Sequence, residues 1–344
     1  MLDAFAARFG GTASFVVQLV DALLKRDDIE RLVVLAEHDS VVVRDLRPAA
    51  RLRLIRLAVP ARGRVPWRVV WETIRLPRLL ESEGADALLT FSGVVPRHPT
   101  CRVVSLVSNP GPYKPPWTFW NRVRRHAIAR TTRRAQRLHV PSRAFAEMMR
   151  EPGARVVPHG VDHDLFRPAA EPGTEILTVG DFYRHKRQDL IISAWTRLPE
   201  PRPMLRMIGN PAVDPSHFRE LNRMTDDPRV VLGGPVGLEE LRNAYHHARV
   251  LVIASGHESF SIPIVEAMAC GVPVIARDHP VLRDTGGPAA IYVSGDDVSA
   301  WARAIQRLLS DDSAHGDLRE KGIRRTEGLT WQAVAEAVVA DVRG

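Results

Sequence analysis

The chain has 344 residues, a formal net charge of +8 and 45% hydrophobic residues. That length predicts two domains of about 170 residues each rather than one core. No apolar run approaches the ~20 residues that span a bilayer, and the first residues lack the basic and apolar regions of a secretory signal. Its two cysteines, Cys101 and Cys270, lie in different halves, which argues against a disulfide framework and predicts a reducing, cytoplasmic setting.

The charge is divided unevenly along the chain. Residues 1–172 hold 28 Lys and Arg against 17 Asp and Glu, a net charge of +11, whereas residues 173–344 hold 20 against 23, a net charge of −3. A basic half beside a mildly acidic half indicates an anionic partner for the first half. The codon usage of a GC-rich genome is the alternative; it explains Arg in place of Lys but leaves the asymmetry unexplained.

Short apolar runs alternate with amphipathic segments throughout the chain. In the first half we predict strands at 32–36, 52–59, 85–91, 102–107, 138–141 and 155–158. In the second half we predict strands at 175–179, 205–208, 230–232, 250–254, 272–276 and 290–293. Helices are predicted at 12–26, 67–83, 187–197, 238–247, 262–270, 297–310 and 330–342. This alternation predicts an α/β protein whose parallel sheets are covered by helices on both faces.

A segment rich in Pro, Gly and Ala, "FRPAAEPGTE", lies near the midpoint at residues 166–175 and is interpreted as the interdomain linker. We therefore predict an N-terminal domain over 1–168, a C-terminal domain over 169–328, and a closing helix within 329–344 that can pack back on the first domain. Open α/β sheets bind ligands at the carboxyl ends of their strands. The site is accordingly expected in loops that follow strands, in a cleft between the two sheets.

The most informative stretch is "GHESFSIPIVEAMACGVPVIARD", which follows the strand at 250–254. Glu258 lies in the loop and Glu266 in the predicted helix. Ser261 is placed to cap that helix, and Gly271 to end it. A helix N-terminus at a strand end is a ready anion site. The alternative reading is a solvated loop acid followed by an acid that complements the helix dipole.

Three further segments carry candidate chemistry. "ILTVGDFYRHKRQDL" follows a strand and places Arg184 and Lys186 before a helix, a pair suited to a diphosphate or simply to solvent. "RFGGTASFVVQLVDALLKR" opens a helix with Gly10 and Gly11, which permit close approach of a ligand or a tight turn.

The third segment, "VVPHGVDHDLFRP", contains the Asp-x-Asp pair of Asp162 and Asp164. The pair could hold a metal ion, but the rest of the sequence offers no matching ligand shell. We therefore interpret the segment as a crossover into the linker and predict no metal and no cofactor.

Taken together and in order, these motifs resemble the retaining glycosyltransferases of family 4, which have the GT-B fold of two Rossmann-like domains. "ESFSIPIVEAMACGVPVIA" resembles the Glu-x7-Glu signature of that family. "RFGGTASFVVQLVDALL", "VVPHGVDHDLFRP" and "TVGDFYRHK" resemble its N-terminal glycine loop, its crossover and its donor-phosphate loop. "LEELRNAYHHARVLVIAS" and "LTWQAVAEAV" resemble the segment before the signature and the closing helix.

The resemblance implies a role for each matched residue. Glu258 lies beside the donor sugar, Glu266 accepts hydrogen bonds from the ribose, and Arg184 and Lys186 hold the diphosphate. Further donor contacts are implied for the residues of the glycine and signature loops: Gly10, Gly11, Gly180, Ser259, Phe260 and Ser261. His159, in the crossover, is assigned to the acceptor or sugar side. A leaving diphosphate stabilised by Arg184, Lys186 and a helix N-terminus needs no metal.

The chain departs from the family pattern in three places. Glu258-Ser259-Phe260-Ser261 stands where many members have Glu-Gly-Phe-Gly. Asn109, within "LVSNPGPY", stands where many members have a histidine after an N-terminal strand, and its expected role is to position a sugar or the acceptor. Only "MLDAFAARF" precedes Gly10, so the first strand is short or the chain begins earlier than this sequence does.

The resemblance implies transfer of a hexose from a nucleotide-diphosphate sugar to a hydroxyl acceptor, which can be a lipid-linked glycan, a polysaccharide or a small aglycone. Trp117, Phe119 and Trp120 precede the Arg-rich stretch 122–137, and this combination suits an anionic membrane surface. A nucleotide-sugar 2-epimerase of the same fold is one alternative. A basic nucleic-acid-binding protein is another, although the Arg-rich stretch has little aromatic interleaving and no recognised motif, so no nucleic-acid partner is predicted.

Overall fold

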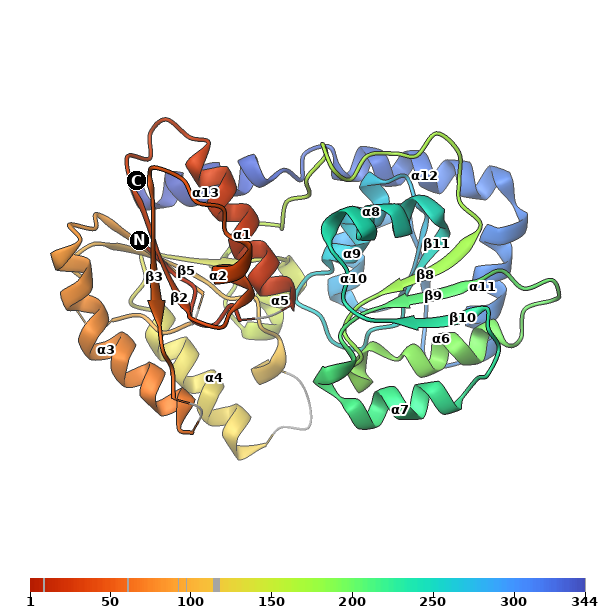
Figure 1. Cartoon of the computed structure of the whole chain (residues 1–344), viewed down its shortest axis with the longest axis horizontal. Coiled ribbons are helices and arrows are strands. Elements are labelled where there is room, and N and C mark those ends of the chain that lie inside the picture. Colours follow the sequence, from red (N-terminus) through yellow and green to blue (C-terminus); the bar gives the residue numbers. More distant parts are fainter. Residues whose placement is uncertain (9, 61, 92, 97, 114–117, 344) are drawn as a thin grey trace. The chain divides into compact units, whose positions relative to one another are not determined.

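The computed structural model describes residues 1–8, 10–60, 62–91, 93–96, 98–113 and 118–343. It divides into two compact units. The N-terminal unit comprises Met1–Gly160 together with Trp331–Gly344, and the C-terminal unit comprises Val161–Thr330. Each unit is a parallel sheet between layers of helices, as the alternating sequence pattern predicts (Figure 1).

The N-terminal unit is built on a seven-stranded sheet in the order β3-β2-β1-β4-β5-β6-β7. Its strands are β1 (Leu2–Asp3), β2 (Leu32–Glu37), β3 (Leu52–Leu57), β4 (Ala87–Thr90), β5 (Arg102–Leu106), β6 (Arg137–Val140) and β7 (Arg155–Val156). Its helices are α1 (Gly10–Leu24), α2 (Val41–Asp45), α3 (Arg64–Ser82), α4 (Phe119–Thr132), α5 (Arg143–Met149), α13 (Trp331–Arg343) and the short 3-10 helix η1 (Gly111–Tyr113).

In the inner strands of this unit, successive side chains are buried on opposite faces of the sheet, because side chains alternate along a strand. Val34 of β2 and Val104 of β5 pack in the cluster that includes α1 and α13. Their neighbours Leu35 and Val103 pack in a second cluster with Leu76 and Leu80 of α3. Burial on both faces explains why these strands read as continuous apolar runs.

The C-terminal unit has a six-stranded sheet in the order β10-β9-β8-β11-β12-β13. Its strands are β8 (Glu175–Val179), β9 (Leu205–Ile208), β10 (Val230–Gly233), β11 (Ala248–Ile253), β12 (Val274–Arg277) and β13 (Ala290–Val293). Its α-helices are α6 (Gln188–Trp195), α7 (Pro215–Arg223), α8 (Leu238–His247), α9 (Ile262–Ala269), α10 (Pro280–Gly286), α11 (Val298–Ser310) and α12 (Asp312–Thr326). Its 3-10 helices are η2 (Arg184–Lys186), η3 (Pro211–Val213) and η4 (Gly287–Ala289).

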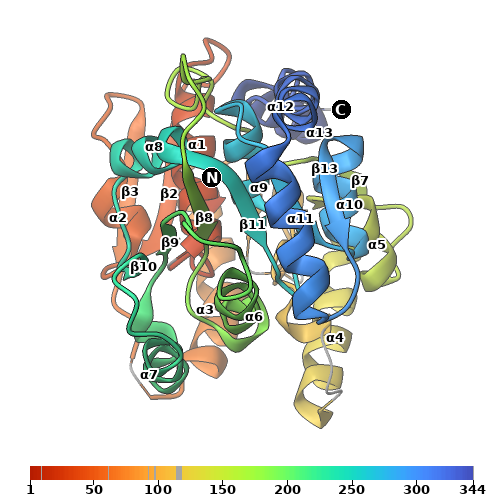
Figure 2. The same cartoon turned by 90° about the vertical axis from the view of Figure 1, so that its right-hand side faces the viewer.

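The same alternation organises the core of the C-terminal unit. Val250 and Val252 of β11 pack with the fully buried Trp195 and Trp301. These tryptophans belong to α6 and α11, which lie side by side (Figure 2). Leu251 packs on the other face, in the cluster that includes residues of α8, α9 and α10. Each sheet therefore holds its strand ends on a rigid, two-sided core.

All twelve predicted strands are present, with ends that differ by at most two residues. A short first strand was one of two alternatives drawn from the sequence, but no residue range was predicted for β1, because two residues carry no period. It nevertheless pairs in parallel with both β2 and β4. Several helices were also missed, including α2, α5, α7, α10 and α12, because their apolar faces are short or interrupted by charge.

The unit boundary differs from the predicted linker. Residues 161–168 belong to the C-terminal unit, because Val161 bridges to Thr330 and Phe166 packs edge-on against Tyr245 in its core. At the other end, α13 belongs to the N-terminal unit, where Val334 and Val338 are buried against the cluster around α1. Its Asp341 also lies 2.6 Å from His139 of β6. Among the described helices, none is long and apolar enough to cross a membrane.

Candidate functional site

The order of strands in the C-terminal sheet locates its ligand-binding edge. The chain starts at β8, adds β9 and β10 on one side, and then returns to add β11 on the other. In an open parallel sheet, the carboxyl ends of the two strands at such a reversal leave a crevice between their loops. The loops after β8 and β11 are those that carry Lys186 and Glu258, the residues selected from the sequence.

Two contacts join these loops, which are about 70 residues apart in the sequence. The Lys186 ammonium donates a 2.6 Å hydrogen bond to Oε1 of Glu258, and both side chains are largely buried. The Gly256 N–H donates a 2.8 Å bond to the His185 carbonyl. A cation and a carboxylate thus meet at the crevice, held by backbone on either side.

The loop after β8 is shaped by two glycines. Gly180 has φ +153° and lets the aliphatic stem of Lys186 pass at ordinary contact distance. Gly209 approaches so closely that an added Cβ would lie 2.2 Å from the Gly180 carbonyl oxygen. That oxygen also accepts a hydrogen bond of 3.2 Å from Gln188. The path of the loop, and with it the position of Lys186, is therefore set by close backbone packing.

Helix α9 starts directly behind the Glu258 loop. Ser261 occupies its N-cap position, but its side chain makes no capping hydrogen bond, contrary to our prediction. A proline stands in the first turn of the helix, and Gly271 follows its end with φ +73°, as predicted for that glycine. Ser259, Phe260 and Ser261 are buried. The loop between Glu258 and the helix is consequently packed into the unit rather than extended into solvent.

Glu266 lies in α9, where the Tyr245 hydroxyl donates a 2.8 Å hydrogen bond to its Oε2. Burial raises the pKa of the Glu266 carboxyl to about 7, and the bond from Tyr245 opposes part of that shift. The pKa of Cys270, one turn further on, is raised to about 12 by burial and then by the charge of Glu266. Glu266 is thus a carboxyl that changes its charge near neutral pH.

Arg184 points away from this pair. Its guanidinium donates a 2.7 Å hydrogen bond to Glu220 of α7 and lies 3.7 Å from Asp214. The bond to Glu220 raises the pKa of Arg184. Arg184 is more than half exposed, so exchange of its acidic partners for a ligand anion is sterically open. The structure therefore brings Lys186 to Glu258, and Arg184 to a different set of partners.

Histidines surround the Glu258 loop. The rings of His185 and His257 lie 6.2 Å apart, and His185 stacks on Tyr183 at 5.4 Å. Burial, followed by the proximity of His257, lowers the pKa of His279, whereas the Glu258 carboxylate opposes the shift. These histidines and Tyr245 were not selected from the sequence. Contacts between the ends of neighbouring strands produce neither a motif nor a periodicity in the sequence.

The N-terminal unit presents its own selected residues at the corresponding edge of its sheet. The reversal there lies between β1 and β4, and the loop after β1 leads to Gly10 and Gly11, both exposed, with Gly10 at φ +64°. Asn109 follows β5 and is exposed, and its Oδ1 accepts a 2.8 Å bond from the Gly111 N–H.

His159, the last of these residues, is buried in the N-terminal unit. Its ring lies 4.5 Å from that of Phe15, and burial lowers its pKa to about 3, which leaves the ring neutral at pH 7.

In the Asp-x-Asp pair of Asp162 and Asp164, the Asp162 side chain makes local hydrogen bonds with the backbone. Oδ1 of Asp162 accepts hydrogen bonds from the backbone N–H groups of Asp164 and Leu165, at 3.1 and 3.2 Å. Across residues 1–343, leaving out the positions that the structure does not describe, no three His, Cys, Asp or Glu side chains gather as a metal-binding group.

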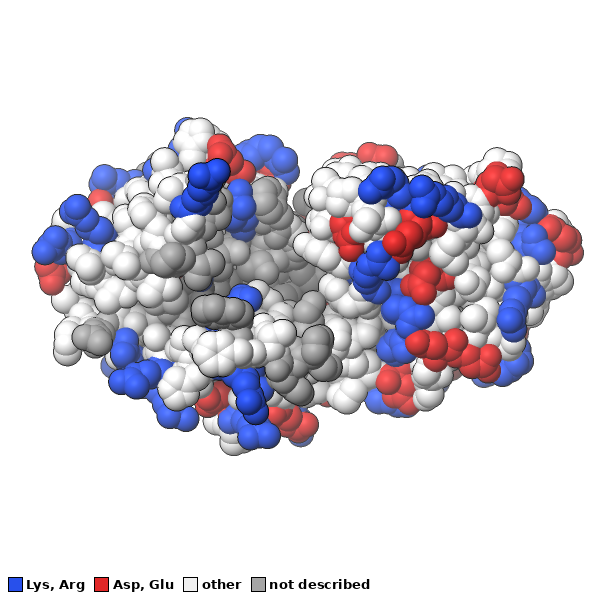
Figure 3. All heavy atoms as spheres, turned by 90° about the horizontal axis from the view of Figure 1, so that it is seen from below, with Lys and Arg blue, Asp and Glu red and all other residues white. Residues whose placement is uncertain are grey.

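Basic side chains are present on both units (Figure 3). On the C-terminal unit blue and red side chains are interspersed, in keeping with its many ion pairs. In the N-terminal unit, α4 carries exposed Arg122 and Arg124 beside Phe119, which is 71% exposed, and Val123. Trp117 lies outside the described residues, as does the side chain of Trp120.

Two family models match the chain and together cover most of it. The model described as Glycosyltransferase Family 4 matches residues 9–165, and the one described as Glycosyl transferases group 1 matches residues 173–311. Among curated proteins, D-inositol 3-phosphate glycosyltransferase of Kineococcus radiotolerans is 30% identical in an alignment 219 residues long that covers 54% of this chain and 50% of that protein. The chain thus spans about half the length of the curated relatives it matches.

Solved structures agree with the fold over the whole chain. Sucrose-phosphate synthase from Thermosynechococcus elongatus superimposes with a TM-score of 0.83 and 22% identity, covering 99% of this chain and 97% of the other. Anabaena HepE, in complex with UDP-glucose, superimposes with a TM-score of 0.79 and 13% identity, covering 99% and 98%. The predicted GT-B fold is confirmed.

Proposed function

Since the chain belongs to the group 1 and family 4 glycosyltransferases, we propose that it is a retaining hexosyltransferase using a nucleotide-diphosphate sugar and a hydroxyl acceptor. The observation that carries the proposal is the contact between Lys186 and Glu258 at the strand reversal of the C-terminal sheet. It supplies a cation for a diphosphate and a carboxylate for a developing sugar cation within one crevice.

Each residue has a part in the reaction. The bond between the anomeric carbon and the diphosphate breaks, a bond from that carbon to the acceptor oxygen forms, and the acceptor proton passes to the departing diphosphate. Lys186 and Arg184 stabilise the charge that collects on the diphosphate. Glu258 stabilises the positive charge on the sugar ring. Because side chains stabilise the negative charge on the diphosphate and the positive charge on the sugar, the proposed reaction needs no metal and no cofactor.

Glu266 is assigned to the ribose. When Glu266 is ionised, both of its carboxylate oxygens act only as acceptors, whereas the protonated form keeps one acceptor oxygen and gains an O–H donor. Burial raises its pKa to about 7. The backbone at Gly180 and the segment Ser259, Phe260 and Ser261 would line the donor, as their positions in the two loops support. HepE was solved with UDP-glucose, so a uridine nucleotide is the first donor to test.

The N-terminal unit is assigned to the acceptor. Gly10 and Gly11 leave the backbone open at its strand reversal, and Asn109 and His159 lie in the loops after the carboxyl ends of β5 and β7. His159, neutral at pH 7, would act as a hydrogen-bonding or packing group rather than as a cation. The cationic and apolar surface of α4 favours an acceptor presented at an anionic membrane, which would place the protein in the cytoplasm and at the inner face of that membrane.

The test is a panel of nucleotide-diphosphate sugars, first by thermal shift and then by product analysis. A nucleotide sugar present at a concentration 100 times its dissociation constant should stabilise the native state by about 2.7 kcal/mol. With an acceptor, the anomeric configuration of the product is read by NMR, and an inverted product would overturn retention. Conversion of the donor sugar without any acceptor would identify a 2-epimerase. Salt-dependent binding to duplex nucleic acid without affinity for nucleotide sugars would contradict the proposal.

A further inference from the structure

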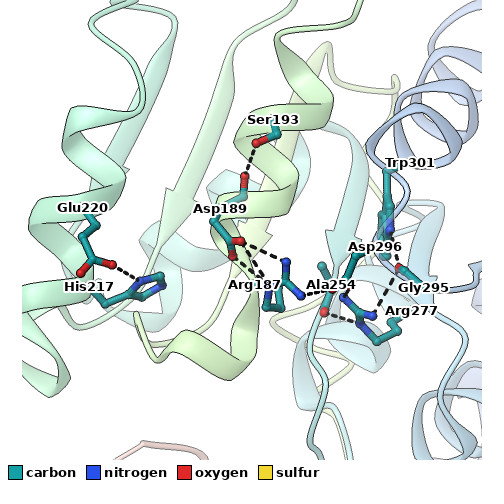
Figure 4. A network of polar contacts seen from close by, with 10 residues as sticks. All are labelled: Arg187, Asp189, Ser193, His217, Glu220, Ala254, Arg277, Gly295, Asp296 and Trp301. Atoms are coloured by element: carbon teal, nitrogen blue, oxygen red, sulfur yellow. Dashed lines mark hydrogen bonds and ion pairs between the residues drawn. The ribbon is translucent and has the colours of Figure 1, made fainter.

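A ring of polar contacts passes through the two loops that carry Lys186 and Glu258. Figure 4 draws the part of it that runs from Ala254 through Arg277 and Asp296 to Arg187. We infer that Asp296, in the loop after β13, is a positioning residue that holds these loops in register by bridging Arg187 and Arg277. The expected effect of Asp296 on turnover rests on the proposed function. The statement that Asp296 holds the two loops rests on the contacts alone.

The first side of the ring starts next to Lys186. Arg187 follows it directly and has φ +56°, a left-handed conformation that a residue with a Cβ adopts only when its surroundings demand it. Its guanidinium donates to both oxygens of Asp189, at 3.1 and 3.2 Å, and to Oδ2 of Asp296 at 2.5 Å. The backbone at the end of η2 is therefore fixed by a side chain that Asp296 holds.

The second side of the ring ends next to the Glu258 loop. Arg277, at the end of β12, donates a 2.7 Å hydrogen bond to Oδ1 of Asp296. Its other nitrogens donate to the carbonyl of Ala254 at 2.8 Å and to that of Gly295 at 3.3 Å. Ala254 follows β11 and stands two residues before Gly256, the residue whose N–H bonds to His185.

The ring therefore closes. From Ala254 it runs through Arg277, Asp296 and Arg187 to Lys186, and from there back through Glu258 or through His185 and Gly256. Asp296 is the one acidic member that touches both arginines, and each of its oxygens serves a different one. Neutralising it would leave two neighbouring guanidinium groups without their shared anion, so that their repulsion would act directly on the two loops.

Burial separates this arrangement from an ordinary surface ion pair. The Arg277 side chain is 14% exposed and lies over the Trp301 ring at 6.0 Å, so its direction is fixed by packing. Asp296 itself is 53% exposed and can be changed without opening a cavity. An asparagine there keeps the size of the side chain, but it can accept through only one oxygen. Asp296→Asn therefore removes one bridge at little cost to packing.

The experiment compares Asp296→Asn with Asp312→Asn. Asp312 likewise pairs with a mostly buried arginine, Arg249, but that pair lies outside the ring. Amide hydrogen exchange is measured on peptides that contain Gly256, whose N–H closes the ring at His185. Donor turnover and the dissociation constant of the nucleoside diphosphate are measured on the same samples, with Asp296→Glu as the conservative variant.

In the Asp296→Asn protein we expect faster exchange at Gly256 and a loss of kcat/KM between about 10-fold and 100-fold, the range that misplaced catalytic groups produce. Asp312→Asn should change neither quantity, and Asp296→Glu should recover part of the turnover. In a Lys186→Ala background the further loss from Asp296→Asn should shrink to less than about 2-fold, because the group that it positions is gone.

Unchanged exchange at Gly256 in Asp296→Asn, or a full additional loss in the Lys186→Ala background, would overturn the inference. If the parent protein transfers no sugar while the exchange result is as expected, the ring stands and the proposed function is the part that fails.

Discussion

The Tyr245 hydroxyl donates a 2.8 Å hydrogen bond to Oε2 of Glu266, and the whole tyrosine is buried. The bond joins α8 to α9, and it fixes one lone pair of a carboxyl whose pKa burial raises to about 7. Because the Tyr245 hydroxyl favours the ionised form, it counteracts the burial that favours the protonated form. The balance between the two sets the pH at which Glu266 becomes ionised, and so the pH above which both of its oxygens are available for the hydrogen bonds proposed from a ribose.

We therefore expect donor affinity to rise as pH increases through about 7 in the parent protein. Tyr245→Phe removes the stabilising bond and should move that midpoint to higher pH. Glu266→Gln should abolish the midpoint and weaken binding above about pH 7, where the parent carboxyl is ionised. Calorimetric titration with the nucleoside diphosphate between pH 5.5 and 8.5 measures all three, and a parent affinity independent of pH would contradict the assignment of Glu266.

The same group links folding to pH. Its pKa in the folded protein, about 7, lies above the ordinary value of 4.5, so the folded state holds the proton more tightly than the unfolded state. Its stabilising contribution is complete below about pH 4.5 and is lost as pH rises towards 7, by about 1.4 kcal/mol for each unit of pKa shift. Stability of Glu266→Gln should fall less over that interval, as urea unfolding at several pH values would show.

Sequence periodicity predicted the fold well where strands are buried on both faces. Runs such as 175–179 (EILTV) and 205–208 (LRMI) are mainly apolar, and their observed ends coincide with the prediction. The residue range of the short first strand, β1, could not be predicted, because two residues are too few to show a period. The linker was misplaced because composition marks a flexible segment, whereas Phe166 is held by a contact with Tyr245 that lies 79 residues away.

The site was predictable only as far as its motifs extend. Lys186 and Glu258 were selected from separate segments, and their contact follows from the neighbouring positions of β8 and β11. Arg184 also lies in a recognisable motif. Its partners Glu220 and Asp214 lie in none, so these ion pairs could not be predicted from the sequence. The bridge through Asp296 depends on three strand ends and the start of α6, which only the folded sheet brings together.

Gly209 should not tolerate a side chain. An added Cβ would stand 2.2 Å from the Gly180 carbonyl, and backbone on both sides leaves little room to relax. We expect Gly209→Ala to destabilise the protein by about 1–3 kcal/mol, as overpacking usually does. Gly316→Ala is the control, because Gly316 lies inside α12 with no atom within 4 Å of an added Cβ, and alanine there should stabilise by about 1 kcal/mol. Urea unfolding followed by tryptophan fluorescence compares the two.

Transfer should continue in excess chelator. Oδ1 of Asp162 accepts hydrogen bonds from the backbone N–H groups of Asp164 and Leu165. In the proposed reaction, Lys186 supplies the positive charge that a metal would otherwise bring to the diphosphate. Rates with and without EDTA should agree within about 2-fold. If activity disappears in EDTA and Mn²⁺ restores it, metal independence is wrong, and loss of that rescue in Asp162→Asn would identify the ligand.

Helix α4 should bind anionic vesicles at low salt. Phe119 and Val123 lie one turn apart and are 71% and 42% exposed, beside exposed Arg122 and Arg124. A basic residue near an anionic surface contributes about 1 kcal/mol, so Arg124→Glu should weaken binding at least about 5-fold. Arg324→Glu, at an exposed position of α12, serves as the control. Vesicle flotation with and without phosphatidylserine measures the effect; if the parent protein ignores anionic vesicles, a soluble acceptor replaces the lipid-linked one.

The last prediction separates Glu258 from its partner Lys186. Glu258 should act mainly in the transition state, where the sugar becomes positive, so Glu258→Gln should lower turnover by about 10²–10³-fold. The nucleoside diphosphate should bind this variant as tightly as the parent or more tightly, because Lys186 no longer shares its charge with a carboxylate. Lys186→Ala should instead weaken diphosphate binding by more than about 10-fold. Glu200→Gln, which disrupts an exposed pair with Arg229, should leave both quantities unchanged. Calorimetry alongside turnover measures the set. Should Glu258→Gln lose diphosphate affinity while keeping its turnover, Glu258 would be part of the diphosphate site rather than a partner of the sugar.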